Sequence, residues 1–158
     1  LLEAFDRYHP DKISKTAAKN FKDIIGAWKK TDALVAERSY STQAAGISYT
    51  DTEILEVSAN GKFKRVKVHS HYSGNCSQVD GSTEYGTLQA KNNKLVFQVQ
   101  SGSELITDNC SPSLNRTIKR KPHTEIFTWS IRSNINNPGA QMLCLNKQDG
   151  TAVCLDRQ

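Results

Sequence analysis

The stretch Ile24-Ile25-Gly26-Ala27-Trp28-Lys29 divides the chain into two parts of different character. Before it, apolar residues recur with helical spacing between Ile13 and Ile25. After it, short apolar runs are separated by turn residues, which is typical of β-strands. We therefore expect residues 1–25 to be an N-terminal helical segment that ends at Gly26, and residues 26–158 to be a β domain.

The size and composition of the chain favour one globular domain with a basic surface. Its 158 residues carry a net charge of +5, with a sequence pI of about 9.0 and a mean hydropathy of −0.58. No apolar run approaches the roughly 18 residues that a membrane-spanning helix needs, so we expect no transmembrane segment. The first residue is Leu1 rather than Met. We therefore expect a processed chain or a fragment, and a removed signal peptide is compatible with that.

The C-terminal sequence predicts one disulfide from the geometry of a hairpin. A three-residue loop at 148–150 places Cys144 opposite Cys154, and it brings Leu143 and Leu145 to face Leu155 and Val153 on the other side of the hairpin. A two-residue loop would shift the register by one and mix the apolar and cysteine faces. Opposed strand positions are close enough for a disulfide.

The remaining two of the four cysteines then predict a second disulfide, Cys76–Cys110. No Cys-x-x-Cys pair is present, which argues against a zinc knuckle. Two disulfides indicate an oxidising location. We therefore expect a secreted, periplasmic or extracellular-surface protein.

The region after Gly26 predicts an all-β fold of eight or nine short strands joined mostly by hairpins. Asn60-Gly61 and Ser101-Gly102 are expected to be turns, 36–50 a long loop over one end, and 111–122 a basic connection. An antiparallel meander of this kind removes its exposed edges by closing into a barrel. The expected strands cover residues 27–35, 53–59, 62–72, 81–90, 95–100, 104–110, 124–132 and 142–156.

This arrangement resembles the lipocalin-like, or calycin, barrels. The resemblance rests on Gly26-Ala27-Trp28 after a short helix, on the hairpin meander, and on Arg157 just past the last strand. It implies structural roles for Gly26, Trp28 and Arg157: the tryptophan would close the floor of the barrel and the arginine would pack over it. It also implies an apolar cup that holds a small ligand.

Alternation along the strands predicts which side chains line this cup. Apolar residues are expected to point inward, so on strand 62–72 the other face, with Arg65, Lys67, His69 and His71, is expected to meet solvent. The same list describes a filled core equally well, because eight-stranded barrels can be packed solid. The expected inward residues are Val66, Val68, Tyr72, Leu95, Phe97, Val99, Phe127 and Trp129.

Two groups of basic residues are candidates for binding anions such as a polyanion or an anionic lipid. One is the stripe Arg65, Lys67, His69 and His71, and the other is the loop group Arg116, Lys119, Arg120 and Lys121. His69 and His71, with His123, could also ligate a metal. We favour the basic stripe, and we expect no metal and no cofactor.

The sequence favours a binding protein over an enzyme. No Gly-x-Ser-x-Gly elbow or paired-carboxylate site is recognisable, and Asp51, Glu53 and Glu56 are interpreted as ordinary surface charges. The expected function is to hold a small apolar or amphipathic ligand, as a lipid-binding protein does. The alternative is an accessory domain of an extracellular or envelope assembly, with a solid core and a basic surface for a protein partner.

Three Asn-x-Ser/Thr motifs begin at Asn75, Asn109 and Asn115. They matter if the protein is secreted from a eukaryotic cell, and two of them include a cysteine.

Overall fold

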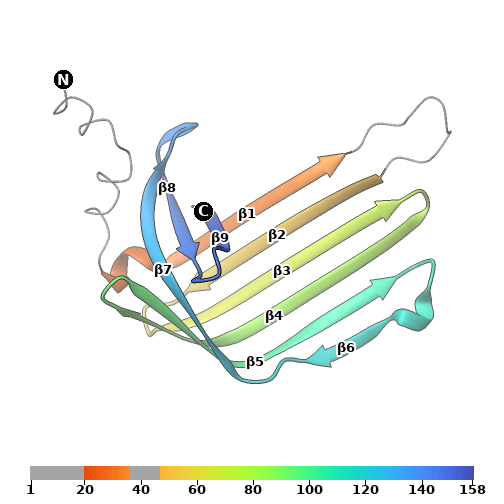
Figure 1. Cartoon of the computed structure of the whole chain (residues 1–158), viewed down its shortest axis with the longest axis horizontal. Coiled ribbons are helices and arrows are strands. Elements are labelled where there is room, and N and C mark those ends of the chain that lie inside the picture. The colour runs from red at the N-terminus through yellow and green to blue at the C-terminus, as the bar shows by residue number, and fades with distance from the viewer. Residues whose placement is uncertain (1–19, 36–46) are drawn as a thin grey trace.

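The chain folds into one antiparallel sheet whose ends meet. A computed structural model describes residues 20–35 and 47–158. Within these residues the strand order is β4-β3-β2-β1-β9-β8-β7-β5-β6, and β4 also pairs with β5, which closes eight of the nine strands into a ring (Figure 1). The elements are η1 (Phe21–Ile24), β1 (Gly26–Val35), β2 (Ile47–Val57), β3 (Lys62–Ser73), β4 (Cys76–Lys91), β5 (Lys94–Asp108), η2 (Pro112–Leu114), β6 (Arg116–Lys119), β7 (His123–Asn134), β8 (Asn137–Asn146) and β9 (Ala152–Arg157).

The strand β5 is where the sheet divides. Its first half, 94–99, pairs with β7, and its second half, 103–106, pairs with the short strand β6. In Figure 1 strands β1 to β6 form a broad wall, while β7 and β8 bend away from it. The ring is therefore complete at one end, where β9 meets β1 at Trp28 and Lys29. At the other end, none of the described strands pairs with that edge of β1.

Several element predictions need correction. The strand β2 begins at Ile47, so the expected loop 36–50 is shorter; residues 36–46 lie outside the described residues. Ser101-Gly102 is not a turn, because β5 runs straight through it. A Cβ on Gly102 would lie 2.6 Å from the carbonyl oxygen of Thr83, so this glycine permits close strand approach. The expected loop 111–122 contains η2 and β6.

The predicted N-terminal helical segment 1–25 lies largely outside the described residues. Its described end forms the 3₁₀ turn η1 rather than an α-helix. Neither described helix is long and apolar enough to cross a membrane.

The closed end of the ring holds the apolar core. Trp28 is fully buried and its indole Nε1 donates a hydrogen bond to the carbonyl oxygen of Ile24, 2.8 Å away. The guanidinium of Arg157 lies over the Trp28 ring, as the resemblance implied. Gly26 has φ of +129°, which suits glycine as the chain leaves η1. The other buried core residues include Leu55, Val57, Phe63, Leu88, Leu95, Phe97, Val99, Phe127, Trp129, Ile131, Leu143, Leu145 and Leu155.

The C-terminal hairpin has the predicted register. Cys144 faces Cys154, Leu143 faces Leu155 and Leu145 faces Val153. The N–H of Lys147 donates to the carbonyl oxygen of Thr151, which closes the three-residue loop. Both predicted disulfides, Cys144–Cys154 and Cys76–Cys110, are present.

Candidate functional site

The inner face of β3 is polar, which reverses the prediction for this strand. Arg65 is 3 % exposed and pairs across the sheet with the fully buried Leu55, so the face that carries Arg65, Lys67, His69 and His71 points inward. The predicted cup residues Val66, Val68 and Tyr72 share the outer face, and Tyr72 is 45 % exposed. The apolar alternates of β3 are therefore outside, because buried acidic partners make a charged inner face tolerable.

Strand register brings acidic residues from two neighbouring strands, β2 and β4, beside these basic ones. In β3–β4 pairing, Arg65 faces Glu84, Lys67 faces Ser82 and His69 faces Asp80. On the other side, Lys67 faces Glu53 and His69 faces Asp51. Since directly opposed residues share a face, the inner surface of β2, β3 and β4 carries rows of alternating charge.

The deepest row is a buried ion-pair layer centred on Arg65. Its Nη2 donates to Glu84 Oε2 at 2.8 Å and also to Glu125 of β7. The ammonium of Lys147 donates to the other oxygen of Glu125 at 3.0 Å. These contacts connect β3, β4 and β7 across the inside of the ring, and they neutralise charges that would be costly to bury alone.

The charges in this layer fix one another's protonation. Burial would raise the pKa of Glu125, but the hydrogen bond and charge of Arg65, followed by those of Lys147, lower it to about 2. Burial would lower the pKa of Arg65, but Glu125 and then Glu84 outweigh burial and raise it. Both groups are therefore ionised at neutral pH.

Aromatic side chains fill the space directly beneath the ion-pair layer. Phe97 packs edge-to-face against Phe63 and Phe127, with ring centres 5.0 and 5.2 Å apart. Arg65 lies over the Phe97 ring and Lys147 over the Phe127 ring, at 5.1 and 5.3 Å from the ring centres.

The predicted cup residues Leu95, Phe97, Val99, Phe127 and Trp129 do point inward, and they are buried core residues. Here the ring interior is close-packed, so these five side chains belong to the filled-core alternative.

A polar cavity of about 330 Å³ opens on the other side of the ion-pair layer. It is lined by residues of β1 to β5, together with Arg120 and, from β9, Val153. Val68 borders it, and it is the only one of the eight predicted cup residues that does. Its carboxylates are Asp32, Asp51, Glu53, Asp80 and Glu104, and its basic groups are Lys30, Lys67, Arg120 and His69.

The acidic groups of the cavity outnumber its permanent cations by five to three. Four of the carboxylates have a basic neighbour, in the pairs Lys30–Asp32, Lys67–Glu53, Arg120–Glu104 and His69–Asp51. Among the described residues, Asp80 has no ion-pair or hydrogen-bond partner, although it faces His69 across the strands. The cavity thus carries an excess of negative charge inside a protein whose net charge is +5.

The histidine metal site, which the sequence left as the less favoured alternative to a basic stripe, is not formed by the described residues, because His123 does not group with His69 and His71. The group with metal-like spacing is instead Glu84, His123 and Glu125, whose ligand atoms all lie within 4.8 Å of one another. The guanidinium of Arg65 already bonds to both carboxylates. A metal ion would have to displace it, so the three residues act as part of the ion-pair layer.

The second predicted anion site is split by the structure. Arg116, Lys119 and Lys121 are exposed on β6 or just after it. Arg120 is instead half-buried, with its guanidinium 3.4 Å from Glu104 and 3.9 Å from Glu84. Neither predicted basic group is therefore a continuous basic surface, and the Arg65 to His71 stripe lies on the inner face of the sheet, where Lys67 and His69 remain about half exposed.

Sequence reasoning missed the acidic half of the site. Asp51 and Glu53 were expected to be ordinary surface charges, but both line the cavity. A usable signal was the two-residue turn Gly74-Asn75, which fixes every β3–β4 pair from Ser73–Cys76 onward and so matches Arg65 with Glu84.

No protein-family model matches the chain, and no curated protein matches it.

Proposed function

We propose that the protein is a secreted binding protein with a lipocalin-like barrel, and that it holds a small amphipathic ligand in the polar cavity. The observation that carries this proposal is the 330 Å³ cavity, lined by charged groups from five strands and lying next to the ion-pair layer, since Lys67 and Ser82 follow Arg65 and Glu84 on the same face. Pockets for small organic molecules begin at about 300 Å³. Two disulfides are compatible with the secreted location.

The charge of the cavity favours a ligand with a positively charged group. An ammonium beside Asp80 would gain an ion pair without breaking an existing one, because Asp80 has no partner among the described residues. A ligand carboxylate would instead have to compete with Asp51, Glu53 or Glu104 for their basic neighbours. The close-packed aromatic core leaves the apolar part of such a ligand near Val153, which faces the buried Leu145 on the inner side of the hairpin.

The test compares two probes of equal size and opposite charge. Binding of an alkylammonium and of the matching alkylcarboxylate is measured by isothermal titration calorimetry on the native protein. We expect the ammonium to bind and Asp80→Asn to weaken it roughly tenfold, the effect of losing one partly solvated ion pair worth about 1.4 kcal/mol. The matched control is Asp156→Asn on β9, since Asp156 is exposed and does not line the cavity. Equal or absent binding of both probes would contradict the proposal.

A second candidate function is docking of an acidic partner on the exposed cations of β6. Arg116, Lys119 and Lys121 are exposed, and in the described part of the chain none of them has an ion-pair partner. Such an accessory domain would bind heparin or anionic lipid in a salt-dependent way. Lys119→Glu with Lys121→Glu would abolish that binding and leave the ammonium probe unaffected.

A further inference from the structure

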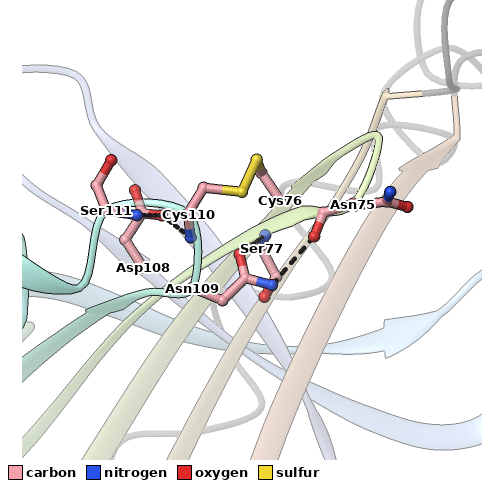
Figure 2. The surroundings of a disulfide bond; sticks show 7 residues. All are labelled: Asn75, Cys76, Ser77, Asp108, Asn109, Cys110 and Ser111. Atoms are coloured by element: carbon pink, nitrogen blue, oxygen red, sulfur yellow. Dashed lines mark hydrogen bonds between the residues drawn. A yellow bond between two sulfur atoms is a disulfide. The ribbon is translucent and has the colours of Figure 1, made fainter.

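The three Asn-x-Ser/Thr motifs lie close together in space, at one end of the sheet. The disulfide Cys76–Cys110 joins the β3–β4 turn to the end of β5, so Asn75-Cys76-Ser77 and Asn109-Cys110-Ser111 lie side by side (Figure 2). The third motif, Asn115-Arg116-Thr117, leads from η2 into β6. Although the motifs have the same form, their asparagines have different surroundings.

Asn109 uses its whole side-chain amide to hold the β3–β4 turn. Its Oδ1 accepts a hydrogen bond from the N–H of Ser77 at 2.7 Å, and its Nδ2 donates to the carbonyl oxygen of Asn75 at 3.0 Å (Figure 2). Its backbone N–H also donates to the carbonyl oxygen of Ser77. Asn109 thereby extends the β4–β5 ladder by one more step, with the disulfide beside it.

Asn115 has the opposite arrangement. Its Oδ1 accepts a hydrogen bond from the N–H of Asp108 at 2.6 Å, whereas its Nδ2 has no partner among the described residues. Asn115 is exposed, as Asn109 also is, and its backbone is extended, with φ −63° and ψ 127°. Thr117 is also exposed, on the short strand β6.

The chemistry of glycosylation distinguishes these two residues. The Nδ2 atom forms a bond to C1 of the first sugar of a lipid-linked oligosaccharide, the bond from C1 to the pyrophosphate oxygen breaks, the lipid pyrophosphate leaves, and Nδ2 gives up one proton. At Asn115 the modified nitrogen has no hydrogen bond to lose among the described residues, and the Oδ1 contact can remain. At Asn109 the sugar would have to fit between the two segments that the disulfide joins. Asn75 has an exposed side chain, but it lies in a tight turn next to a bridged cysteine.

We propose that Asn115 is an N-glycosylation site of the folded protein, and that Asn109 is a structural clamp that stays unmodified despite its identical motif. The same contacts explain both halves of the proposal: Nδ2 is engaged at Asn109 and unengaged at Asn115.

Site occupancy tests the first half. The full chain is secreted from insect cells behind a cleavable signal peptide, treated with a peptide N-glycosidase in ¹⁸O water, and mapped by mass spectrometry. We expect the Asn115 peptide to carry the label and the Asn109 peptide to carry none. Thr117→Ala should abolish the label and Thr117→Ser should keep it. An unlabelled Asn115, or a labelled Asn109 in the secreted protein, would overturn the proposal.

Thermal melting of unglycosylated protein tests the clamp. Asn109→Ala and Ser111→Ala both destroy the motif, but only the first removes the two side-chain hydrogen bonds. We expect Asn109→Ala to lower the melting temperature by roughly 4–8 °C and Ser111→Ala to leave it nearly unchanged. If the two variants melt alike, Asn109 is no clamp.

Discussion

The guanidinium carbon of Arg157 lies 4.2 Å from the centre of the Trp28 ring. Its Nη1 and Nη2 also donate hydrogen bonds to the carbonyl oxygens of Ile25 and Asp23. Those two carbonyls belong to the chain just before β1. One side chain from the last strand therefore satisfies two hydrogen-bond acceptors at the start of the first strand. This contact reinforces the β1–β9 junction, where only two residue pairs form.

The first prediction concerns this junction. Arg157→Lys keeps the charge but loses the planar group that stacks on Trp28 and bonds two carbonyls at once. We expect it to lower the free energy of unfolding by roughly 1–3 kcal/mol, measured by reversible urea denaturation. Gln158→Ala, which leaves the adjoining backbone hydrogen bond to Ala27 intact, is the control. A stable Arg157→Lys variant would show that the stacking contributes little.

The second prediction concerns acid stability. The pKa of Glu125 falls from 4.5 to about 2 on folding. The stability that this carboxylate contributes is therefore fully present above pH 4.5 and is lost as the pH falls from 4.5 towards 2. Its size is on the order of 3 kcal/mol.

Glu125→Gln should consequently lower stability at pH 7 by about 3 kcal/mol and flatten the stability profile between pH 4.5 and 2. Chemical denaturation at several pH values measures both effects. The exposed Glu56→Gln on β2 serves as the control. An unchanged pH profile in Glu125→Gln would mean that another group dominates acid unfolding.

The third prediction uses two glycines of the same strand. A Cβ on Gly86 would lie 1.8 Å from the carbonyl oxygen of Gln98, beside the irregularity in β4–β5 pairing. A Cβ on Gly81 would meet nothing within 4 Å. We expect Gly86→Ala to destabilise the protein by about 2–4 kcal/mol or to prevent folding, and Gly81→Ala to change stability by less than about 0.5 kcal/mol. Comparable melting curves for the two variants would contradict this assignment.

The fourth prediction separates the core from the site. Phe127 packs on Phe97 and does not line the polar cavity. Phe127→Ala should therefore cost about 3–5 kcal/mol of stability and leave the affinity for the ammonium probe unchanged, as calorimetry below the melting temperature would show. A large loss of affinity in the folded variant would place the ligand among the aromatic residues instead.

The parts of the fold that the sequence predicted are those where two local signals agree. In the C-terminal hairpin, the apolar alternation and the two cysteines demand the same three-residue loop. Asn60-Gly61 also forms a turn as expected, with Gly61 at φ +83°. The connection has three residues rather than the expected two, because the Ser58 N–H bonds to the Lys62 carbonyl oxygen. Such turns are encoded within a few residues, so one sequence is enough to find them.

The face of β3 could not be read locally, because the partners that stabilise Arg65 are 19 and 60 residues away. Val66 and Val68 suggested that the apolar face of β3 is the inner one. The buried Phe63 lies two residues before Arg65 and therefore shares the true inner face with it. The turn predicted at Ser101-Gly102 was wrong for a similar reason. Gly102 is needed there because Thr83, on the neighbouring strand, approaches its backbone closely. Charge compensation and close backbone approach are properties of the assembled sheet.

The incomplete pairing of β1 and β6 has a consequence for solubility. Beyond Lys29, no strand in the described chain pairs with the outer side of β1, and β6 bonds only to β5. Unpaired strand edges invite other chains to add to a sheet, and short strands and lysines discourage this. Here β6 is four residues long and carries Arg116 and Lys119, while β1 presents Lys30 and Asp32. Charge at both open edges therefore discourages edge-to-edge strand addition by other chains, and Lys119→Val would weaken that protection at β6.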